Sequence, residues 1–353
     1  MTKLLTLSLF INCLISIWLF SFPASLHAAD EAKVFVYHRF GDMRYPSTNV
    51  SLSRFKEHLE ILREENFTVL TLGDVVDRLL NGAVLPERCA VLTVDDAYRS
   101  FLTGAVPLLR EFGFPATLFV STDTVGGNDY LNWSELQTLH AMGIEIGNHS
   151  SSHSHLVNRK TGEGKTEWRD RVVEDVARAQ KLLAQHLGQA PELFAYPYGE
   201  YSNDLIEIVK QFGFKAAFAQ HSGVVARGEE AYTLPRFPMG GSSGEGAEFL
   251  KKLLMRHMPV KILGSSDTII RDDNPPCLRV WIDTSSIDIR SIRCYVPGQE
   301  PASVKNISGQ DNVFEIQAQQ PLQERRSKYT LTASDEQGAQ WFWFSKLWVL
   351  PDL

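Results

Sequence analysis

Residues 89–98 read CAVLTVDDAY, a stretch in which a short apolar, β-branched run ends in two acids. The first six residues have the pattern of a buried strand, and the segment from Tyr98 to Glu111 has that of a helix. Asp95 and Asp96 therefore stand where a βα loop begins, at the rim that carries the chemistry of parallel α/β folds. The alternative is structural, because an acid at this point also serves as a helix N-cap.

A second polar segment, residues 149–156 (HSSSHSHL), also follows a strand-like run, at residues 144–147. Side chains four residues apart share one face of a helical turn, so His149 and His153 can converge on one ion. With the acidic pair they would form a divalent metal site and leave one carboxylate free, which is the equipment of a metal-dependent hydrolase. A His-rich surface tract that binds metal only by accident is the alternative.

The two segments resemble the first two motifs of the polysaccharide deacetylase family, the NodB-homology carbohydrate esterases. Their order and spacing agree with Thr-Phe-Asp-Asp-Gly and His-(Ser/Thr)-x-x-His, and residues 194–199 (FAYPYG) are similar to a third motif, Arg-x-Pro-Tyr-Gly. Residues 213–218 and 233–236 resemble later family segments. The resemblance covers roughly residues 33–260 and implies a distorted, incomplete (β/α) barrel.

The resemblance also implies roles for single residues. Asp96, His149 and His153 would bind the metal, Asp95 would be the general base, and Tyr198 would offer its backbone N–H to the oxyanion. A cation beside Asp95 keeps that carboxylate ionised, so it can take a proton from the attacking water. We expect zinc, with cobalt, nickel or iron as alternatives, because a two-His, one-Asp site accepts each of them.

Two parts of the family pattern are missing. Ala195 stands where the third motif has arginine, and Arg236 is the candidate replacement unless it is an ordinary structural arginine. The motif Leu-x-His-Asp, which supplies the general acid, has no clear counterpart; His221 is the first candidate for this catalytic role, and His38 is a weaker second. The missing motifs and the Tyr37-His38 opening are similar to the subfamily that deacetylates extracellular poly-N-acetylglucosamine.

The N-terminus has the features of a secretory signal peptide over residues 1–29. It contains Lys3, an apolar stretch at residues 4–22 and small residues just before position 30. An uncleaved membrane anchor is the alternative. We therefore expect a secreted, periplasmic or cell-surface protein that is not stably inserted in the membrane after cleavage. The net charge of −7 offers no electrostatic reason to expect nucleic-acid binding.

The mature chain divides into two regions. Residues 30–263 alternate short strands with helical segments and predict the deacetylase barrel, residues 264–276 predict a linker, and residues 277–353 alternate like the strands of a small all-β sandwich. Cys277 and Cys294 lie in this last region and are candidates for a disulfide in an oxidising compartment. Trp341 and Trp343 share one strand face, which is more typical of a core than of a sugar platform.

The acidic pair and the histidines predict a metal-dependent hydrolase, and the family resemblance implies that it removes N-acetyl groups from an amino-sugar polysaccharide. One alternative is an esterase or amidase that uses the same site on another acyl group. A second alternative is a catalytically inactive glycan-binding protein, which Ala195 and the absent acid motif suggest.

Overall fold

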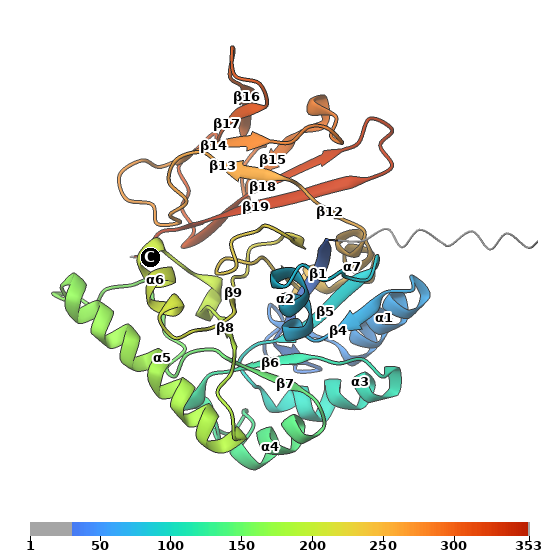
Figure 1. The fold of residues 1–353 in the computed structure, drawn as a ribbon, viewed down its shortest axis with the longest axis vertical. Helices are drawn as coiled ribbons and strands as arrows, with labels where there is room; N and C mark the ends of the chain where they lie inside the picture. Colours follow the sequence, from blue (N-terminus) through green and yellow to red (C-terminus); the bar gives the residue numbers. More distant parts are fainter. Residues whose placement is uncertain (1–29, 352–353) are drawn as a thin grey trace, which may run out of the picture.

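The computed structural model describes residues 30–351, so the predicted signal peptide lies outside the described residues. A curled, mostly parallel sheet forms the body of the first region (Figure 1). Its strands are β1 (Glu31–Tyr37), β4 (Thr68–Leu70), β5 (Cys89–Val94), β6 (Thr117–Val120), β7 (Glu145–Asn148), β8 (Leu193–Ala195), β9 (Ala216–Phe218), β10 (Val225–Ala226) and β11 (Phe237–Pro238).

The strand order explains how this sheet forms an incomplete barrel. The order runs β10-β1-β5-β6-β7-β8-β9, with β11 beside β1 and β4 beside β5, and only the pairing of β10 with β1 is antiparallel. Strands β1, β5, β6, β7, β8 and β9 thus end at the same edge, which gathers the loops that follow them. The predicted distorted barrel is confirmed.

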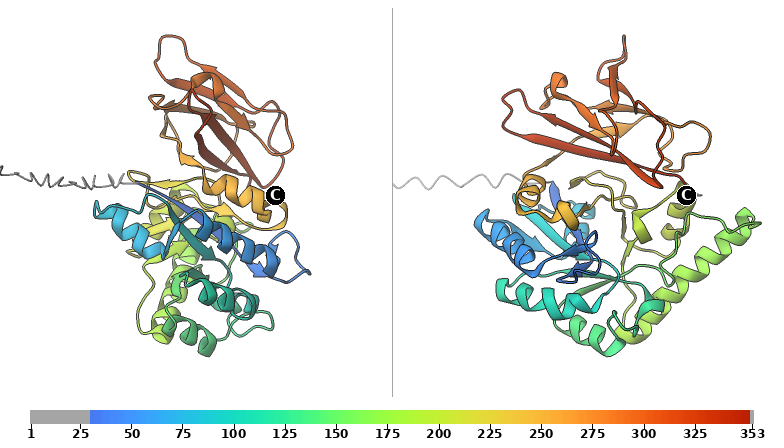
Figure 2. Two further views of the ribbon diagram at one scale, coloured as in Figure 1. Left: turned by 90° about the vertical axis from the view of Figure 1, so that its right-hand side faces the viewer. Right: turned by 180° about the vertical axis from the view of Figure 1, so that it is seen from behind.

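Helices surround the sheet (Figures 1 and 2). They are α1 (Leu52–Glu64), α2 (Leu72–Leu80), α3 (Val106–Phe112), α4 (Trp133–Ala141), α5 (Lys165–Leu187), α6 (Asn203–Lys210) and α7 (Gly246–Leu253). Ser51 caps α1 by accepting a hydrogen bond from the Arg54 amide, and Gly188 ends α5 in the left-handed conformation. The helix predicted after the acidic pair starts as a π turn, Phe101–Ala105, before it continues as α3.

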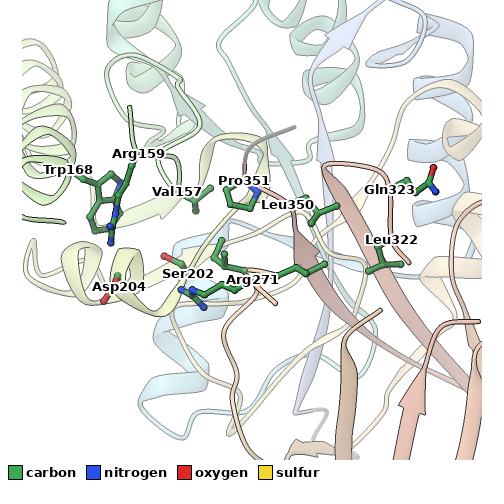
Figure 3. Close-up of a pocket in the computed structure, with 12 residues that line it drawn as sticks. Val157, Arg159, Trp168, Ser202, Asp204, Arg271, Leu322, Gln323, Leu350 and Pro351 are labelled. Carbon is green, nitrogen blue, oxygen red and sulfur yellow. The ribbon is translucent and has the colours of Figure 1, made fainter. Parts of the chain in front are cut away.

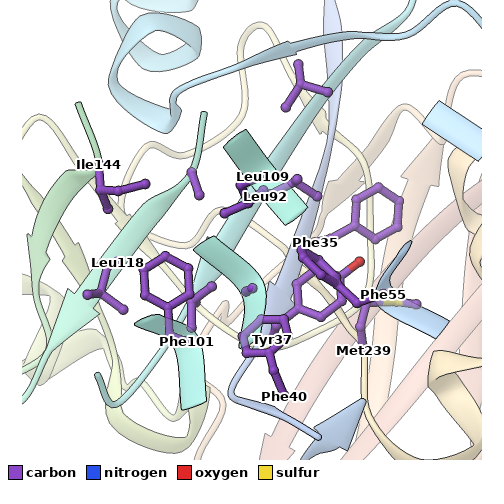
Figure 4. Packing of buried hydrophobic residues seen from close by; sticks show 14 of the residues in the cluster. Phe35, Tyr37, Phe40, Phe55, Leu92, Phe101, Leu109, Leu118, Ile144 and Met239 are labelled. Carbon is purple, nitrogen blue, oxygen red and sulfur yellow. The ribbon is translucent and has the colours of Figure 1, made fainter. Parts of the chain in front are cut away.

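An aromatic-rich core fixes β1 and β5 beneath the loops (Figure 4). Phe35 and Tyr37 of β1 are fully buried, and the Tyr37 ring packs edge-on against Phe55 of α1 at 5.2 Å between centroids. Leu92 of β5 lies in the same cluster. Buried side chains of this size contribute roughly 1.5–3 kcal/mol each, so the strands that carry the rim residues are firmly held.

The second region is built from two four-stranded sheets. One has the order β12 (Arg256–His257), β19 (Trp341–Val349), β18 (Arg326–Ser334) and β15 (Arg293–Tyr295); the other has the order β13 (Val260–Ile262), β14 (Cys277–Ile282), β17 (Val313–Gln317) and β16 (Ser303–Asn306). Strand β14 alternates exposed and buried residues along its length. The predicted β-rich region after the barrel is therefore present, and we call it the β region below.

The predicted disulfide between Cys277 and Cys294 is wrong. Both cysteines are free, and they belong to different sheets. Cys277 faces outward at the start of β14, whereas Cys294 is buried in β15. One thiol points outward from its sheet and the other is buried in the second sheet, so the two do not pair.

The β region packs directly on the barrel (Figures 1 and 2). Trp343 of β19 meets Phe237 of β11 edge-on at 5.6 Å, and Leu347 and Val349 join the apolar cluster under α5 and α6. Trp341, two residues earlier, is 45% exposed. No helix within residues 30–351 combines the length and apolar character needed to cross a bilayer.

Candidate active site

Three side chains from two loops converge at the rim of the barrel. Asp96 follows β5, and His149 and His153 lie in the loop after β7. Each offers one ligand atom, and the three atoms lie within 4.8 Å of one another. Nε2 of His153 is 2.9 Å from Oδ1 of Asp96, and Nε2 of His149 is 3.4 Å from the same oxygen. We call these three residues the triad.

The hydrogen bonding of the triad fits a metal site. Oδ1 of Asp96 and Nε2 of His149 are buried and have no hydrogen-bond partner despite their proximity, a cost of about 1–3 kcal/mol for each atom. Nδ1 of His149 lies 2.8 Å from the Ala195 carbonyl and donates to it, so the lone pair on Nε2 faces the other two ligands. Two imidazoles and one carboxylate are a donor set that divalent zinc and its neighbours accept.

Backbone strain is concentrated in the same loops. Five non-glycine residues there have positive φ: Asp96 at 74°, Ala97 at 57°, Ser150 at 65°, His153 at 52° and Tyr198 at 58°. Such conformations cost of order 1–3 kcal/mol each and cluster at functional sites. The spacing of His149 and His153 suggested a helical turn. The two side chains instead reach one point through a turn with left-handed residues, which accounts for the strain.

Asp95 is held by an arginine that is distant in sequence. Nη1 and Nη2 of Arg236 donate to the two oxygens of Asp95 at 2.7 and 2.8 Å, and both side chains are fully buried. Burial alone would raise the pKa of the Asp95 carboxyl, but the charges of Arg236 and His149 outweigh it and hold that pKa below its usual value. Asp95 is therefore an oriented carboxylate directly beside the triad.

His38 lies at this site, immediately after β1. The side-chain amide nitrogen of Gln220 is 3.2 Å from Oδ2 of Asp95 and 3.4 Å from Nε2 of His38, so one amide bridges the two groups. Burial lowers the pKa of His38, partly offset by the charges of Asp96 and Asp95. Gln220 was not singled out from the sequence; its place just after a barrel strand was the available signal.

His221 occupies a different environment. Its ring lies 6.0 Å from that of Tyr201, and burial, reinforced by Lys346 and Lys328 of the β region, lowers its pKa to about 3. Within residues 30–351, no side-chain hydrogen bond or ring contact joins His221 to Asp95 or to the triad. The structure therefore brings His38, rather than His221, next to the acidic pair.

Tyr198 stands beside the triad in the turn Pro197–Gly199. Its ring packs edge-on against His153 at 4.6 Å and stacks on His155 at 3.9 Å. None of the hydrogen bonds among residues 30–351 uses the Tyr198 backbone N–H. At Gly199 an added Cβ would lie 2.3 Å from the backbone nitrogen of Gln220, so the turn packs closely on the segment that carries Gln220.

Cavity volume does not mark this site. A cavity of about 860 Å³ lies between the barrel and the β region, and it contains none of the triad (Figure 3). Its lining includes Arg159, Trp168 and Ser202 from the barrel and Arg271 and Leu350 from the β region. The site is recognised instead by buried polar atoms that converge without partners.

Comparisons with known proteins agree with this geometry. The family model described as polysaccharide deacetylase matches residues 83–217. A putative polysaccharide deacetylase, YxkH of Bacillus subtilis, is 23% identical over 60% of this chain and 72% of its own length. A poly-beta-1,6-N-acetyl-D-glucosamine N-deacetylase of Staphylococcus aureus is 24% identical over 57% of this chain and 71% of its own.

Solved structures share the barrel. IcaB from Ammonifex degensii matches with a TM-score of 0.56 and 25% identity over 64% of this chain and 97% of that chain. Streptococcus pyogenes deacetylase PplD, in complex with acetate, matches with a TM-score of 0.57 and 19% identity over 63% of this chain and 98% of that chain. This chain thus carries a polysaccharide deacetylase domain at residues 83–217, and it is similar to named deacetylases in sequence and in its barrel.

Proposed function

We propose that this protein is a metal-dependent N-deacetylase of an extracellular amino-sugar polysaccharide. The observation that carries the proposal is Asp95, a buried carboxylate outside the triad that Arg236 orients toward it. Poly-β-1,6-N-acetyl-D-glucosamine is the first substrate to test, because relatives from Staphylococcus aureus are named for it. Secretion to the periplasm or the cell surface follows from the signal-peptide pattern of residues 1–29.

Each part of the reaction is assigned to different residues of the site. A divalent cation held by Asp96, His149 and His153 would supply Lewis acidity to lower the pKa of a water and polarise the acetamide carbonyl. Asp95 takes the proton of the attacking water, with Arg236 keeping its carboxylate ionised and oriented. The free N–H of Tyr198 stabilises the negative charge that develops on the carbonyl oxygen.

His38 is the group we assign to protonate the departing amine. It lies across the Gln220 amide from Asp95, whereas His221 faces the β region. Because burial lowers the pKa of His38, its protonated form gives up a proton more readily than an ordinary imidazolium does. The protonated imidazole gives a ring proton to the amine nitrogen as the C–N bond breaks.

Acetate release tests the proposed function. Zinc-loaded mature protein should release acetate from β-1,6-linked N-acetylglucosamine oligomers, Asp95→Asn should abolish release, and Asp74→Asn on the exposed start of α2 is the matched control. If the wild-type protein releases no acetate while Asp95→Asn still binds the glycan equally well, the protein is a glycan-binding protein rather than an enzyme.

A leaving-group comparison tests His38. His38→Gln should lower the rate on the acetamide substrate by about 10²–10⁴-fold, but it should have little effect on 4-nitrophenyl acetate, whose leaving group needs no proton. His221→Gln serves as the comparison and should leave both rates near wild type. Equal losses on both substrates for His38→Gln would contradict the assignment.

A further inference from the structure

We propose that the β region completes the active site by positioning the Tyr198 turn through Arg326, the first residue of β18, and Arg325, which precedes it. This inference rests on the proposed function, in which the Tyr198 N–H meets the oxyanion. Both arginines come from outside the matched family segment, residues 83–217. They are positioning residues, because they act on the reacting atoms only through other groups.

Arg325 binds Glu200, the residue that follows the turn Pro197–Gly199. Its Nε and Nη2 donate to Oε1 and Oε2 of Glu200, both at 2.8 Å, and the Glu200 side chain is fully buried. Nη2 also donates to Oδ1 of Asn158 at 2.8 Å, which ties in the loop that follows the histidine segment. A bidentate, buried arginine–carboxylate pair fixes both partners in position and in orientation.

Glu200 transmits this position to the turn through His155. Nδ1 of His155 lies 2.9 Å from Oε2 of Glu200, and the His155 ring stacks on the Tyr198 ring at 3.9 Å with an interplanar angle of 16°. The Tyr198 ring also packs edge-on against His153, a member of the triad. A continuous series of contacts therefore runs from the β region to a metal ligand.

The Arg326 side chain binds the backbone of the same turn. Its Nη1 donates to the Tyr198 carbonyl, and its guanidinium carbon lies 5.9 Å from the centre of the Tyr198 ring. Tyr198 has φ 58° and ψ 3°, a left-handed conformation that an aromatic residue rarely adopts without outside support. A hydrogen bond to its carbonyl fixes the peptide group that follows Tyr198 and stabilises that conformation.

The expected effect of losing either arginine falls on kcat. A misplacement of about 1 Å at a reacting centre costs about 10²-fold in rate, whereas glycan contacts elsewhere on the protein are untouched. With zinc-loaded, full-length mature protein, Arg326→Gln and Arg325→Gln should lower kcat on N-acetylglucosamine oligomers by about 10²-fold and leave KM and zinc content unchanged. Arg279→Gln is the matched control, because Arg279 is an exposed residue of β14.

Conservative variants separate positioning from general stability. Arg326→Lys should recover part of the rate, because one donor reaches one carbonyl, while Arg325→Lys should not, because lysine cannot bind both oxygens of Glu200. If Arg325→Gln fails to fold, Arg326→Gln carries the test, because the Arg326 side chain is 42% exposed. An unchanged kcat in folded, zinc-loaded Arg326→Gln overturns the proposal.

Hydrogen–deuterium exchange tests the positioning of the Tyr198 turn without measuring activity. The backbone of residues 196–201 should exchange faster in Arg326→Gln than in wild type, with no change in Arg279→Gln. If wild type releases no acetate but this difference appears, the positioning stands and the proposed function fails. If exchange in this segment is the same in all three proteins, the positioning inference is overturned, whatever the activity.

Discussion

The barrel rim and the β region differ in what lies in their interiors. At the rim, Asp95, Asp96 and His149 are buried, two ligand atoms have no hydrogen-bond partner, and five non-glycine residues have positive φ. In the β region, strands alternate buried and exposed residues around an apolar cluster, and Asn312 is the non-glycine residue with positive φ in the described part of that region. Strain and unsatisfied polar atoms thus mark the part of the molecule that carries chemistry.

The comparison also explains why the two regions stay in contact. The rim needs outside support for its strained turn, and the β region supplies two arginines at the edge where it packs on the barrel. An interface dominated by Trp343, Leu347 and Val349 supplies the apolar attachment. A region with ordinary packing can therefore stabilise a strained site that lies in its neighbour.

Loss of a triad ligand is expected to have the largest effect. His149→Ala removes one of three donors, so metal bound at stoichiometric amounts should be lost together with acetate release. His186→Ala, in the last turn of α5, is the control and should keep both. Elemental analysis of the purified proteins checks the prediction, and retained stoichiometric metal in His149→Ala would refute the ligand assignment.

The second-largest effect should be a difference in how much the ion pairs of the two regions contribute to stability. Arg236→Met leaves the buried Asp95 charge without its partner and should lower the free energy of unfolding by about 3–5 kcal/mol. In the β region, Arg290 is 86% exposed beside Asp288, and Arg290→Met should change stability by less than about 1 kcal/mol. Urea unfolding measures both values.

A double variant separates charge from packing at the rim. Adding Asp95→Asn to Arg236→Met removes the uncompensated charge, so part of the lost stability should return. Equal stabilities of the single and double variants would show that the buried charge is not the cause.

His221, at the boundary between the regions, should make stability depend on acid pH. Its pKa is about 3 in the folded protein against 6.5 for an ordinary histidine, so the unfolded chain binds the extra proton between these values. Stability is therefore lost as pH falls from 6.5 towards 3, by about 1.4 kcal/mol per pH unit. His221→Gln should remove that component, and parallel pH profiles for the two proteins would contradict it.

Two of the three tryptophans of β19, Trp341 and Trp343, should show the smallest effects, and the two effects should differ clearly. Trp341 is exposed, so Trp341→Ala should change stability by less than about 0.5 kcal/mol and leave deacetylation intact. Trp343 packs on Phe237 of the barrel, and Trp343→Ala should cost about 2 kcal/mol or more. A large loss of glycan turnover in Trp341→Ala would instead indicate a sugar platform.

Much of the fold could be predicted from the sequence, because it depends on periodicity and on local conformation. The apolar run at residues 89–94 and the strand–helix alternation around it predict a parallel barrel, and the later alternating runs predict a β-rich region. The acidic pair and the histidine segment fall directly after strands, so their place on one rim was also foreseeable. Even the missing arginine of the third motif could be read from Ala195.

Tertiary structure decided which distant side chains meet. Arg236 and Asp95 are separated by 141 positions, and Arg325 and Glu200 by 125, so no local pattern links either pair. The same is true of His38, which lies beside Asp95 while His221 faces the β region, and of Cys277 and Cys294, which lie on different sheets. Sequence patterns determine where a side chain leaves the backbone, but long-range packing determines what it contacts.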